Sequence, residues 1–289
     1  MFDILDGDDL YAELIMLRSN DLRAFIILEG PTDCHVLDEF INDEHFTTVP
    51  ALGKDRALGA IARLDEGTLL GDVFALLDRD WVGILEEGVT RSEVAYTDSY
   101  DMDACIFFTP GIYEKLAATF CTDHTFKRGA PGCLHSDIST ACVDLAFAVG
   151  VLRFISSRDG LGLALRKFPL DQVASVRDSS VDLSKLIGIA CKRAEKDPED
   201  YPDLLDSLQR ELASIEEPHR YCSGHDLAKA FHLVAKRRWA TKVGADVIER
   251  SARAAYGREH FERSGIYRST SHWVASSGET AWRLARAAG

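Results

Sequence analysis

The sequence of 289 residues lacks several patterns that would place a protein in a class at once. It has no uninterrupted apolar run of the roughly 20 residues that a membrane-spanning helix needs. Its start, residues 1–6 (MFDILD), lacks the basic and then apolar pattern of a signal peptide. It also contains no internal repeat and no low-complexity tract. These absences predict a soluble, cytoplasmic protein with no membrane partner.

Cysteine is scarce and irregularly placed. The chain has 7 cysteines, an odd number, and none of them forms a C-x-x-C pair. Scattered cysteines of this kind are typical of reduced, structural thiols in a cytosolic protein. The same pattern argues against a zinc site.

Positive charge is also in short supply, except near the C-terminus. The formal charge of −14 argues against broad, non-specific affinity for nucleic acid. Residues 236–289 nevertheless contain 11 Lys/Arg and 5 Asp/Glu, so this segment carries +6 and the first 235 residues carry −20. The basic segment either contacts a polyanion locally or forms a solvated helical face, and the sequence leaves both readings open.

Two short apolar runs, each followed by acidic residues, organise the N-terminal half. Residues 25–28 (FIIL) lead into Glu29, and residues 73–77 (VFALL) lead into Asp78 and Asp80. Such runs are typical of parallel strands that are buried on both faces, and the carboxyl ends of parallel strands share one edge of the sheet. Carboxylates that gather there repel one another unless a cation lies among them. The pattern therefore predicts a metal site at this edge.

The order of the expected elements predicts an α/β fold, with a mainly parallel sheet flanked by helices. The expected helices and strands alternate as follows: helix 8–23, strand 25–28, a helix from 31, strand 47–50, a helix from 54, strand 73–77, strand 93–97 and helix 104–108. Helical periods then dominate at 137–166, 182–215, 223–239, 243–256 and 278–287. We expect three parts: an α/β core at 1–109, a helical insertion or lid at 110–222, and a basic, helical segment at 223–289 that packs back on the core.

Each acidic motif also has a purely structural interpretation. Glu29 can ligate a hard cation or act as a general base, and Asp33 lies one helical turn further on. Alternatively, Glu29 is a turn residue and Asp33 only complements a helix dipole. Asp78 and Asp80 flank a single residue, as do acid pairs that hold Mg²⁺ or Mn²⁺ against phosphate oxygens, but D-x-D also occurs in plain turns.

The combination of motifs resembles the Toprim domain of topoisomerases, bacterial primases, recombination proteins and OLD-family nucleases. The shared pattern is E-G-x-x-D after one strand, then G-K, then D-x-D after a later strand. The flanking residues are similar to a branch near the OLD nucleases that includes the Toprim effectors of PARIS-type anti-phage defence. The resemblance covers residues 24–108; its matching segments are 27–33 (ILEGPTD), 52–54 (LGK), 76–80 (LLDRD), 100–106 (YDMDACI) and, more loosely, 223–227 (SGHDL).

The resemblance implies a metal-dependent nuclease that hydrolyses phosphodiesters of DNA or RNA with Mg²⁺ or Mn²⁺. It implies that Glu29 is a metal ligand or general base and that Asp33 is the acid that supports it. It assigns Asp78 and Asp80 to the metal-binding pair. Asp103 best matches a further metal-binding acid at the start of the helix after the next strand.

Other positions are less uniform within the family. Asp101 is the second choice for the acid assigned to Asp103. Trp81 stands after the second acid of D-x-D, where many Toprim domains have glycine. His225 stands where relatives usually carry lysine. A histidine at that position can stabilise transition-state charge only when it is protonated, which would make activity sensitive to pH.

Basic side chains are candidates for contacting substrate phosphates. Lys54 follows Gly53 in the G-K motif, and an ordinary surface lysine is the alternative. Lys236, Arg237 and Arg238 form a second basic group, whose alternative is a charged helix end.

The resemblance also implies a partner. The segment at Gly53 is not a Walker A loop, because neither the earlier glycine spacing nor the Ser/Thr is present. Relatives work with a separately encoded ABC- or AAA-type ATPase, so the implied function is a toxin-like effector of anti-phage defence that a partner ATPase controls. Transfer RNA is one substrate candidate, and a homodimer is an open possibility. The alternatives are a non-catalytic Toprim binding scaffold and a phosphohydrolase that acts on small molecules.

Overall fold

The computed structural model describes residues 7–64, 72–120 and 136–283, and the chain divides into two compact units. The first, here called the sheet unit, comprises Met1–Arg79, Gly88–Asp98 and Gly257–Gly289. The second, the helical unit, comprises Asp80–Glu87 and Ser99–Tyr256. These boundaries differ from the predicted three parts. Residues 80–87 and 99–109, which were predicted to lie in the core, belong with the helical unit, as do residues 223–256, whereas the chain from residue 257 belongs with the sheet unit.

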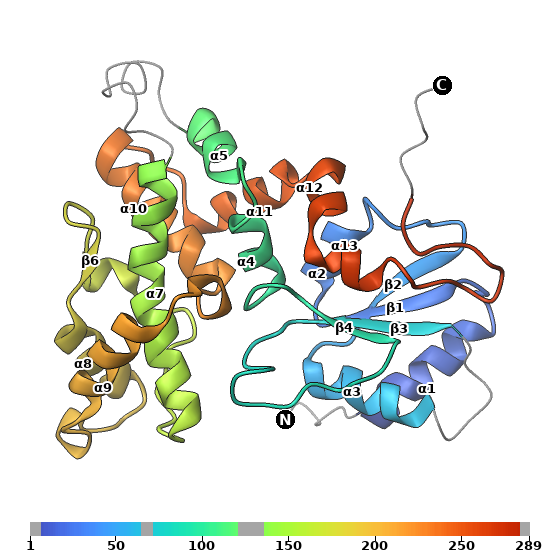
Figure 1. Ribbon diagram of the computed structural model, residues 1–289, viewed down its shortest axis with the longest axis horizontal. Coiled ribbons are helices and arrows are strands. Elements are labelled where there is room, and N and C mark those ends of the chain that lie inside the picture. The colour runs from blue at the N-terminus through green and yellow to red at the C-terminus, as the bar shows by residue number, and fades with distance from the viewer. Residues whose placement is uncertain (1–6, 65–71, 121–135, 284–289) are drawn as a thin grey trace. The chain divides into compact units, whose positions relative to one another are not determined.

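The sheet unit contains four parallel strands in the order β2-β1-β3-β4 (Figure 1). The strands are β1 (Ala24–Leu28), β2 (Phe46–Pro50), β3 (Val73–Leu77) and β4 (Val94–Tyr96). Every residue of the central strands β1 and β3 is buried, as their continuous apolar runs predicted. The predicted α/β class with a parallel sheet flanked by helices is confirmed.

Helices α1 (Gly7–Arg18) and α3 (Lys54–Arg63) cover one face of this sheet (Figure 1). Leu10 and Leu14 of α1 share a buried cluster with Phe25 and Ile27 of β1 and with apolar residues of α3. Residues of β1 two apart point to the same face, so alternate residues of the run serve the two faces. The apolar spacing predicted for both helices is thereby explained.

The other face is covered by α2 (Pro31–Leu37), α12 (Arg258–Arg263), α13 (Gly265–Thr270) and the segment after α13 (Figure 1). Phe74 of β3 stacks on Trp273 with ring centroids 5.1 Å apart, and Phe40 stacks on Phe261 at 4.6 Å. Helices α12 and α13 had not been predicted. They extend the core of the sheet unit from the C-terminal part of the chain.

The helix predicted at 278–287 is wrong for residues 278–283; the remainder lies outside the described residues. Here the chain forms isolated β-bridges instead of a helix: Thr280 pairs with Val274, and Trp282 pairs with Ile41. Ala275 donates its N–H to the Glu279 carbonyl at 2.9 Å across the turn between them. The indole N–H of Trp282 also donates to the Thr270 hydroxyl at 2.9 Å. Burial of this tryptophan in the sheet unit outweighs the local helical spacing.

The helical unit confirms the helix-rich prediction for this part of the chain. Its α-helices in the described ranges are α4 (Met102–Phe107), α5 (Ile112–Phe120), α7 (Ser136–Arg158), α8 (Leu183–Arg193), α9 (Leu204–Ser214), α10 (Gly224–Trp239) and α11 (Ala245–Ala255). Short 3₁₀ turns occupy Leu170–Gln172, Pro198–Asp200 and Pro218–Arg220, and β5 (Ala174–Ser175) pairs with β6 (Ser180–Val181). Helix α7 ends at Arg158, earlier than the predicted residue 166.

Helix α7 forms the interior of this unit. Its segment Ile138–Arg158 has a mean hydropathy of 1.8 and is long and apolar enough to cross a membrane. However, 67% of its apolar stretch is buried inside the protein. A side chain at Gly150 would lie 2.3 Å from the Tyr221 carbonyl oxygen, so the neighbouring backbone packs directly on the helix. Such burial is typical of the core helix of a soluble protein.

Candidate active site at the carboxyl edge of the sheet

The strand order places two of the predicted acids at a distinctive point of the sheet. After β1 the chain forms β2 on one side, whereas after β3 it forms β4 on the other side. In open parallel sheets, the point where the connections diverge in this way leaves a crevice at the carboxyl ends of the strands, where ligands bind. Glu29 follows β1 and Asp78 follows β3, so the two residues flank this point.

The side chain of Glu29 is held in place by two groups. Its Oε1 atom accepts a hydrogen bond from the backbone N–H of Asp78 at 3.0 Å and lies 4.0 Å from Nζ of Lys54. The side chains of Glu29 and Lys54 are only 18% and 16% exposed, so their charges are partly shielded from water. The structure therefore brings the side chain of Glu29 close to Lys54 and to the backbone of Asp78.

The position of Lys54 depends on the turn between β2 and α3. The N–H of Ala51 donates to the Leu28 carbonyl at 2.7 Å, and the N–H of Gly53 donates to the Glu29 carbonyl at 3.1 Å. Gly53 has a φ of +137°, a conformation that residues with a side chain rarely adopt. The glycine of the G-K motif is therefore required by the backbone, and it places Lys54 at the start of α3.

Asp33 supports the turn that carries Glu29. Its Oδ2 atom accepts the backbone N–H of Gly30 at 3.0 Å from the first turn of α2, where Pro31 begins the helix. This hydrogen bond closes the turn between β1 and α2 in the manner of a capping residue. Asp33 thus stabilises the turn that carries Glu29, and its part in catalysis stays a prediction.

The D-x-D motif forms a sharp turn. Arg79 donates its backbone N–H to Oγ1 of Thr97 at 2.9 Å, which ties the motif to the end of β4. Asp80 has a φ of +43°, in the left-handed region, and donates its N–H to the Tyr100 carbonyl at 2.8 Å. Aspartate tolerates this conformation better than most residues. The compact units meet in the sequence here: Asp78 belongs to the sheet unit and Asp80 to the helical unit.

Asp101 joins the N-terminal ends of two helices within the helical unit. Its Oδ1 atom accepts the N–H of Ala104 in α4 at 2.6 Å and the N–H of Gly224 in α10 at 3.0 Å. A Cβ atom on Gly224 would lie 2.1 Å from Cβ of Asp103, so the two helix ends are in direct contact. Burial, reinforced by the charge of Asp103, raises the pKa of Asp101 to about 7 against the opposing effect of these hydrogen bonds.

Asp103 is paired with a basic residue far along the chain. Nε of Arg253 in α11 donates to Oδ1 of Asp103 at 2.7 Å, and Nη2 of Arg253 makes a second bond to Oδ2. Such two-point pairs are stronger and more directional than single hydrogen bonds. The structure thus places the predicted metal ligand Asp103 in an ion pair; whether it also ligates a metal stays a prediction.

His225 also has a carboxylate partner that the sequence had not indicated. Its Nδ1 atom lies 2.5 Å from Oε1 of Glu249, and Oε2 of Glu249 lies 3.9 Å from Nη2 of Arg253. His225 and Asp103 are therefore linked through Glu249 and Arg253. The two residues of α11 lie four apart on an expected helix, a spacing that could have suggested a shared face but not the helix it contacts.

The segment around His225 is anchored to α7. Asp226 is 1% exposed and accepts a hydrogen bond from Nη2 of Arg153, an ion pair that the sequence had not indicated. Ser223 accepts the N–H of Asp226 at 3.3 Å and so caps α10. A buried carboxylate requires such partners. Burial of Asp226 therefore explains part of the S-G-H-D-L pattern by structure alone.

Trp81 is a core residue of the helical unit. Its indole N–H donates to Oγ of Ser157 at 3.1 Å. Its ring meets the rings of Tyr100 and Phe154 edge-on at centroid distances of 5.0 and 5.6 Å. The residue that departs from the glycine of many Toprim domains therefore anchors the chain just after the D-x-D turn.

The second basic group lies at the end of α10. Lys236, Arg237 and Arg238 occupy its last turn, where positive charge stabilises the helix dipole, and Lys236 and Arg237 are exposed. Their position agrees with the alternative that the sequence left open, a charged helix end. Contact with substrate phosphates stays a prediction for these three residues.

The donor atoms at the sheet edge fit a magnesium-type ion in kind. Within residues 7–64, 72–120 and 136–283, no three His, Cys, Asp or Glu residues lie close enough to hold a metal. Mg²⁺, however, is commonly held by one or two carboxylates together with water and substrate phosphates. Glu29 and Asp78 offer hard carboxylate oxygens of that type. The cysteines of the described ranges are buried thiols rather than disulfides, whereas Cys121 and Cys133 lie outside those ranges.

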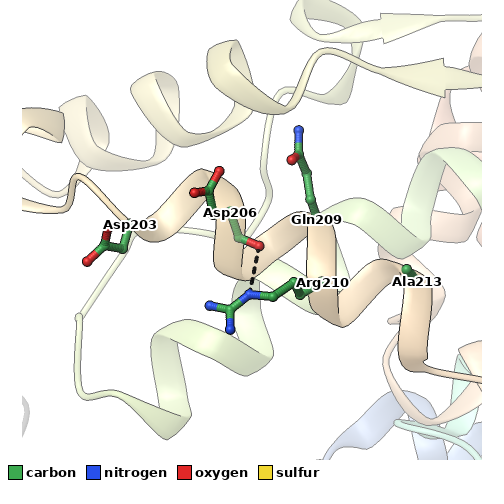
Figure 2. A pocket seen from close by; sticks show the side chains of 5 residues that line it. All are labelled: Asp203, Asp206, Gln209, Arg210 and Ala213. Carbon is green, nitrogen blue, oxygen red and sulfur yellow. Dashed lines mark hydrogen bonds between the residues drawn. The ribbon is translucent and has the colours of Figure 1, made fainter.

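The hollows described elsewhere on the molecule are not lined by the predicted site residues. One of about 540 Å³ follows α9, where Asp203, Asp206, Gln209 and Arg210 point outward and Arg210 donates to the Asp206 carbonyl (Figure 2). Another of about 420 Å³ lies beside α4, α5 and α7. Both are in the helical unit, and neither is lined by a predicted site residue.

No protein-family model matches the sequence, and no curated protein matches it either.

Proposed function

We propose that this protein is a divalent-metal-dependent phosphodiesterase of the Toprim type, a nuclease that acts on DNA or RNA. The observation that carries the proposal is the hydrogen bond between the Glu29 carboxylate and the Asp78 N–H at the diverging strands β1 and β3. The strand order is compatible with a Toprim-like fold. The G-K turn supports the same assignment, because it brings a cationic side chain to within 4.0 Å of Glu29.

The proposed chemistry divides between the metal ion and the protein. When bound, Mg²⁺ or Mn²⁺ polarises a phosphate oxygen and neutralises charge that develops on it. Glu29 and Asp78 would hold the ion together with water and the substrate phosphate. Lys54 would bind a non-bridging phosphate oxygen, since its ammonium group is partly buried beside the carboxylate.

We further propose that activity is controlled by a separately encoded ATPase, as an effector of anti-phage defence requires. The negative charge of the chain supports this, because a body that carries −14 is poorly suited to scan nucleic acid unaided. A recruiting partner would supply the local concentration that the chain's own electrostatics oppose.

The test is cleavage by the purified full-length protein. Plasmid DNA, total RNA and transfer RNA are incubated with Mg²⁺ or Mn²⁺ and either the wild type, Glu29→Gln or Asp78→Asn. Glu44→Gln is the matched control, since Glu44 is an exposed acid at the amino end of β2. Cleavage that both site variants lose and the control retains supports the proposal, whereas cleavage that survives Glu29→Gln contradicts it.

Metal binding separates the nuclease from the non-catalytic alternative. In calorimetric titration with Mn²⁺, the wild type and Glu44→Gln should release the same heat, and Asp78→Asn should release much less. A binding scaffold would show no heat that depends on Asp78. A phosphohydrolase would instead hydrolyse small phosphate esters and leave both polymers intact.

A further inference from the structure

Leu52 combines two features that rarely occur together in a large apolar residue. Its backbone φ is +61°, and its side chain is 62% exposed. The left-handed conformation is unfavourable for residues with a side chain, because Cβ comes too close to the following carbonyl oxygen. The other non-glycine residues with positive φ in the described ranges are Asp, Lys, Ser, Glu or Ala. Leu52 is therefore the position where a bulky apolar side chain is kept despite backbone strain.

The surrounding hydrogen bonds hold this strained conformation in place. On one side, Ala51 donates to the Leu28 carbonyl at 2.7 Å and its own carbonyl accepts from Arg56 at 2.8 Å. On the other side, Gly53 donates to the Glu29 carbonyl at 3.1 Å. Strain of this kind persists where the surroundings over-determine it, and it is often found at functional sites. Glycine would adopt the conformation without strain, so the leucine side chain itself needs an explanation.

The location of Leu52 supplies one. It lies two residues before Lys54, in the turn that leads into α3. The ammonium group of Lys54 lies 4.0 Å from Oε1 of Glu29. A nucleic-acid phosphate bound at Lys54 would bring its adjoining sugar and base close to the same turn. Apolar side chains commonly contact these parts of a nucleic acid.

We propose that Leu52 positions the substrate, by packing its side chain against the nucleoside that adjoins the scissile phosphodiester. The inference rests on the proposed nuclease function and names the part of the substrate that the carboxyl edge recognises. Because an apolar contact reads no hydrogen-bond pattern, Leu52 provides affinity with little preference among bases.

The test compares the kinetics of Leu52→Ala and Leu52→Gly with those of the wild type on a fluorescent oligonucleotide. Both variants should raise KM roughly tenfold, the loss expected when one base contact is removed, and leave kcat nearly unchanged. Leu52→Gly should also melt at a higher temperature than Leu52→Ala, because glycine relieves the strain. Leu22→Ala is the control: Leu22 is 89% exposed and lies before the amino end of β1, so its KM should match the wild type.

Three results would overturn the inference. If the enzyme cleaves and both Leu52 variants have the KM of the wild type, Leu52 does not contact the substrate. If KM is normal in Leu52→Gly and raised only in Leu52→Ala, the change in KM comes from backbone strain and not from loss of the leucine side chain. Normal kinetics of the isolated variants, with loss only when a partner protein is added, would assign Leu52 to a protein interface. A wild type that shows neither Asp78-dependent Mn²⁺ binding nor cleavage of nucleic acid contradicts the proposed function itself, and this inference with it.

Discussion

The carboxylate of Glu29 accepts the backbone N–H of Asp78 across the two central strands of the sheet. A side chain at the exit of β1 is thereby oriented by the backbone at the exit of β3, independently of any ligand. Preorganisation of this kind is what a site needs if its charged groups are to act without rearrangement.

The first prediction separates the two tasks of Glu29. Glu29→Gln retains an oxygen that can accept the Asp78 N–H, so its melting temperature should stay near that of the wild type. Glu29→Ala leaves that N–H unpaired and should lose about 1 kcal/mol of unfolding free energy. Cleavage should fall at least roughly 100-fold in both variants, because neither side chain carries a carboxylate. Chemical denaturation together with a cleavage assay checks this, and an active Glu29→Gln would contradict it.

The second prediction concerns His225, which the resemblance places in catalysis. His225→Ala should lower kcat roughly 100-fold if the imidazole stabilises transition-state charge, whereas His225→Lys should retain much of the rate. His232→Gln is the matched control, since His232 lies on the same helix and bonds to the Val243 carbonyl. Single-turnover cleavage is the measurement. An equal loss in His225→Ala and His232→Gln would show that α10 is merely damaged.

The third prediction concerns the contact between α4 and α10. Gly224→Ala should destabilise the helical unit by about 3 kcal/mol or more, because its Cβ would overlap with Cβ of Asp103 and with backbone atoms. Gly188→Ala is the matched control in α8, where an added Cβ meets no atom within 4 Å. There, alanine should stabilise the helix by up to about 1 kcal/mol. Urea denaturation followed by circular dichroism compares the two, and equal effects would contradict the prediction.

The fourth prediction follows from the raised pKa of Asp101. In the unfolded chain this carboxyl titrates near 3.8, and in the folded protein burial raises the pKa to about 7. Its contribution to stability is therefore fully present below pH 3.8 and is lost as the pH rises through about 7. Asp101→Asn can still accept the N–H bonds but does not titrate, so its stability should vary less across this window. Melting curves at several pH values check this, and parallel profiles for the two proteins would contradict it.

Local features of the sequence were sufficient to predict the two central strands that carry the candidate site. The runs at 25–28 and 73–77 predicted buried central strands, because side chains of both faces had to be apolar. The sequence identified Gly53 only as part of the G-K motif, and the structure shows that the backbone there has a positive φ. The prediction of a helix at 278–287 was wrong at residues 278–283, because Trp282 packs in the core of the sheet unit. The local spacing of apolar residues does not reveal such packing.

The sequence by itself determined that Glu29 and Asp78 follow parallel strands, because the apolar runs and the residues after them are adjacent in the chain. Only the tertiary structure decided which charged groups become partners. Asp103 pairs with Arg253, and His225 pairs with Glu249, through helices that are distant in the sequence. These contacts depend on how helices pack, and helical periodicity reports which face is apolar but not which helix will cover it.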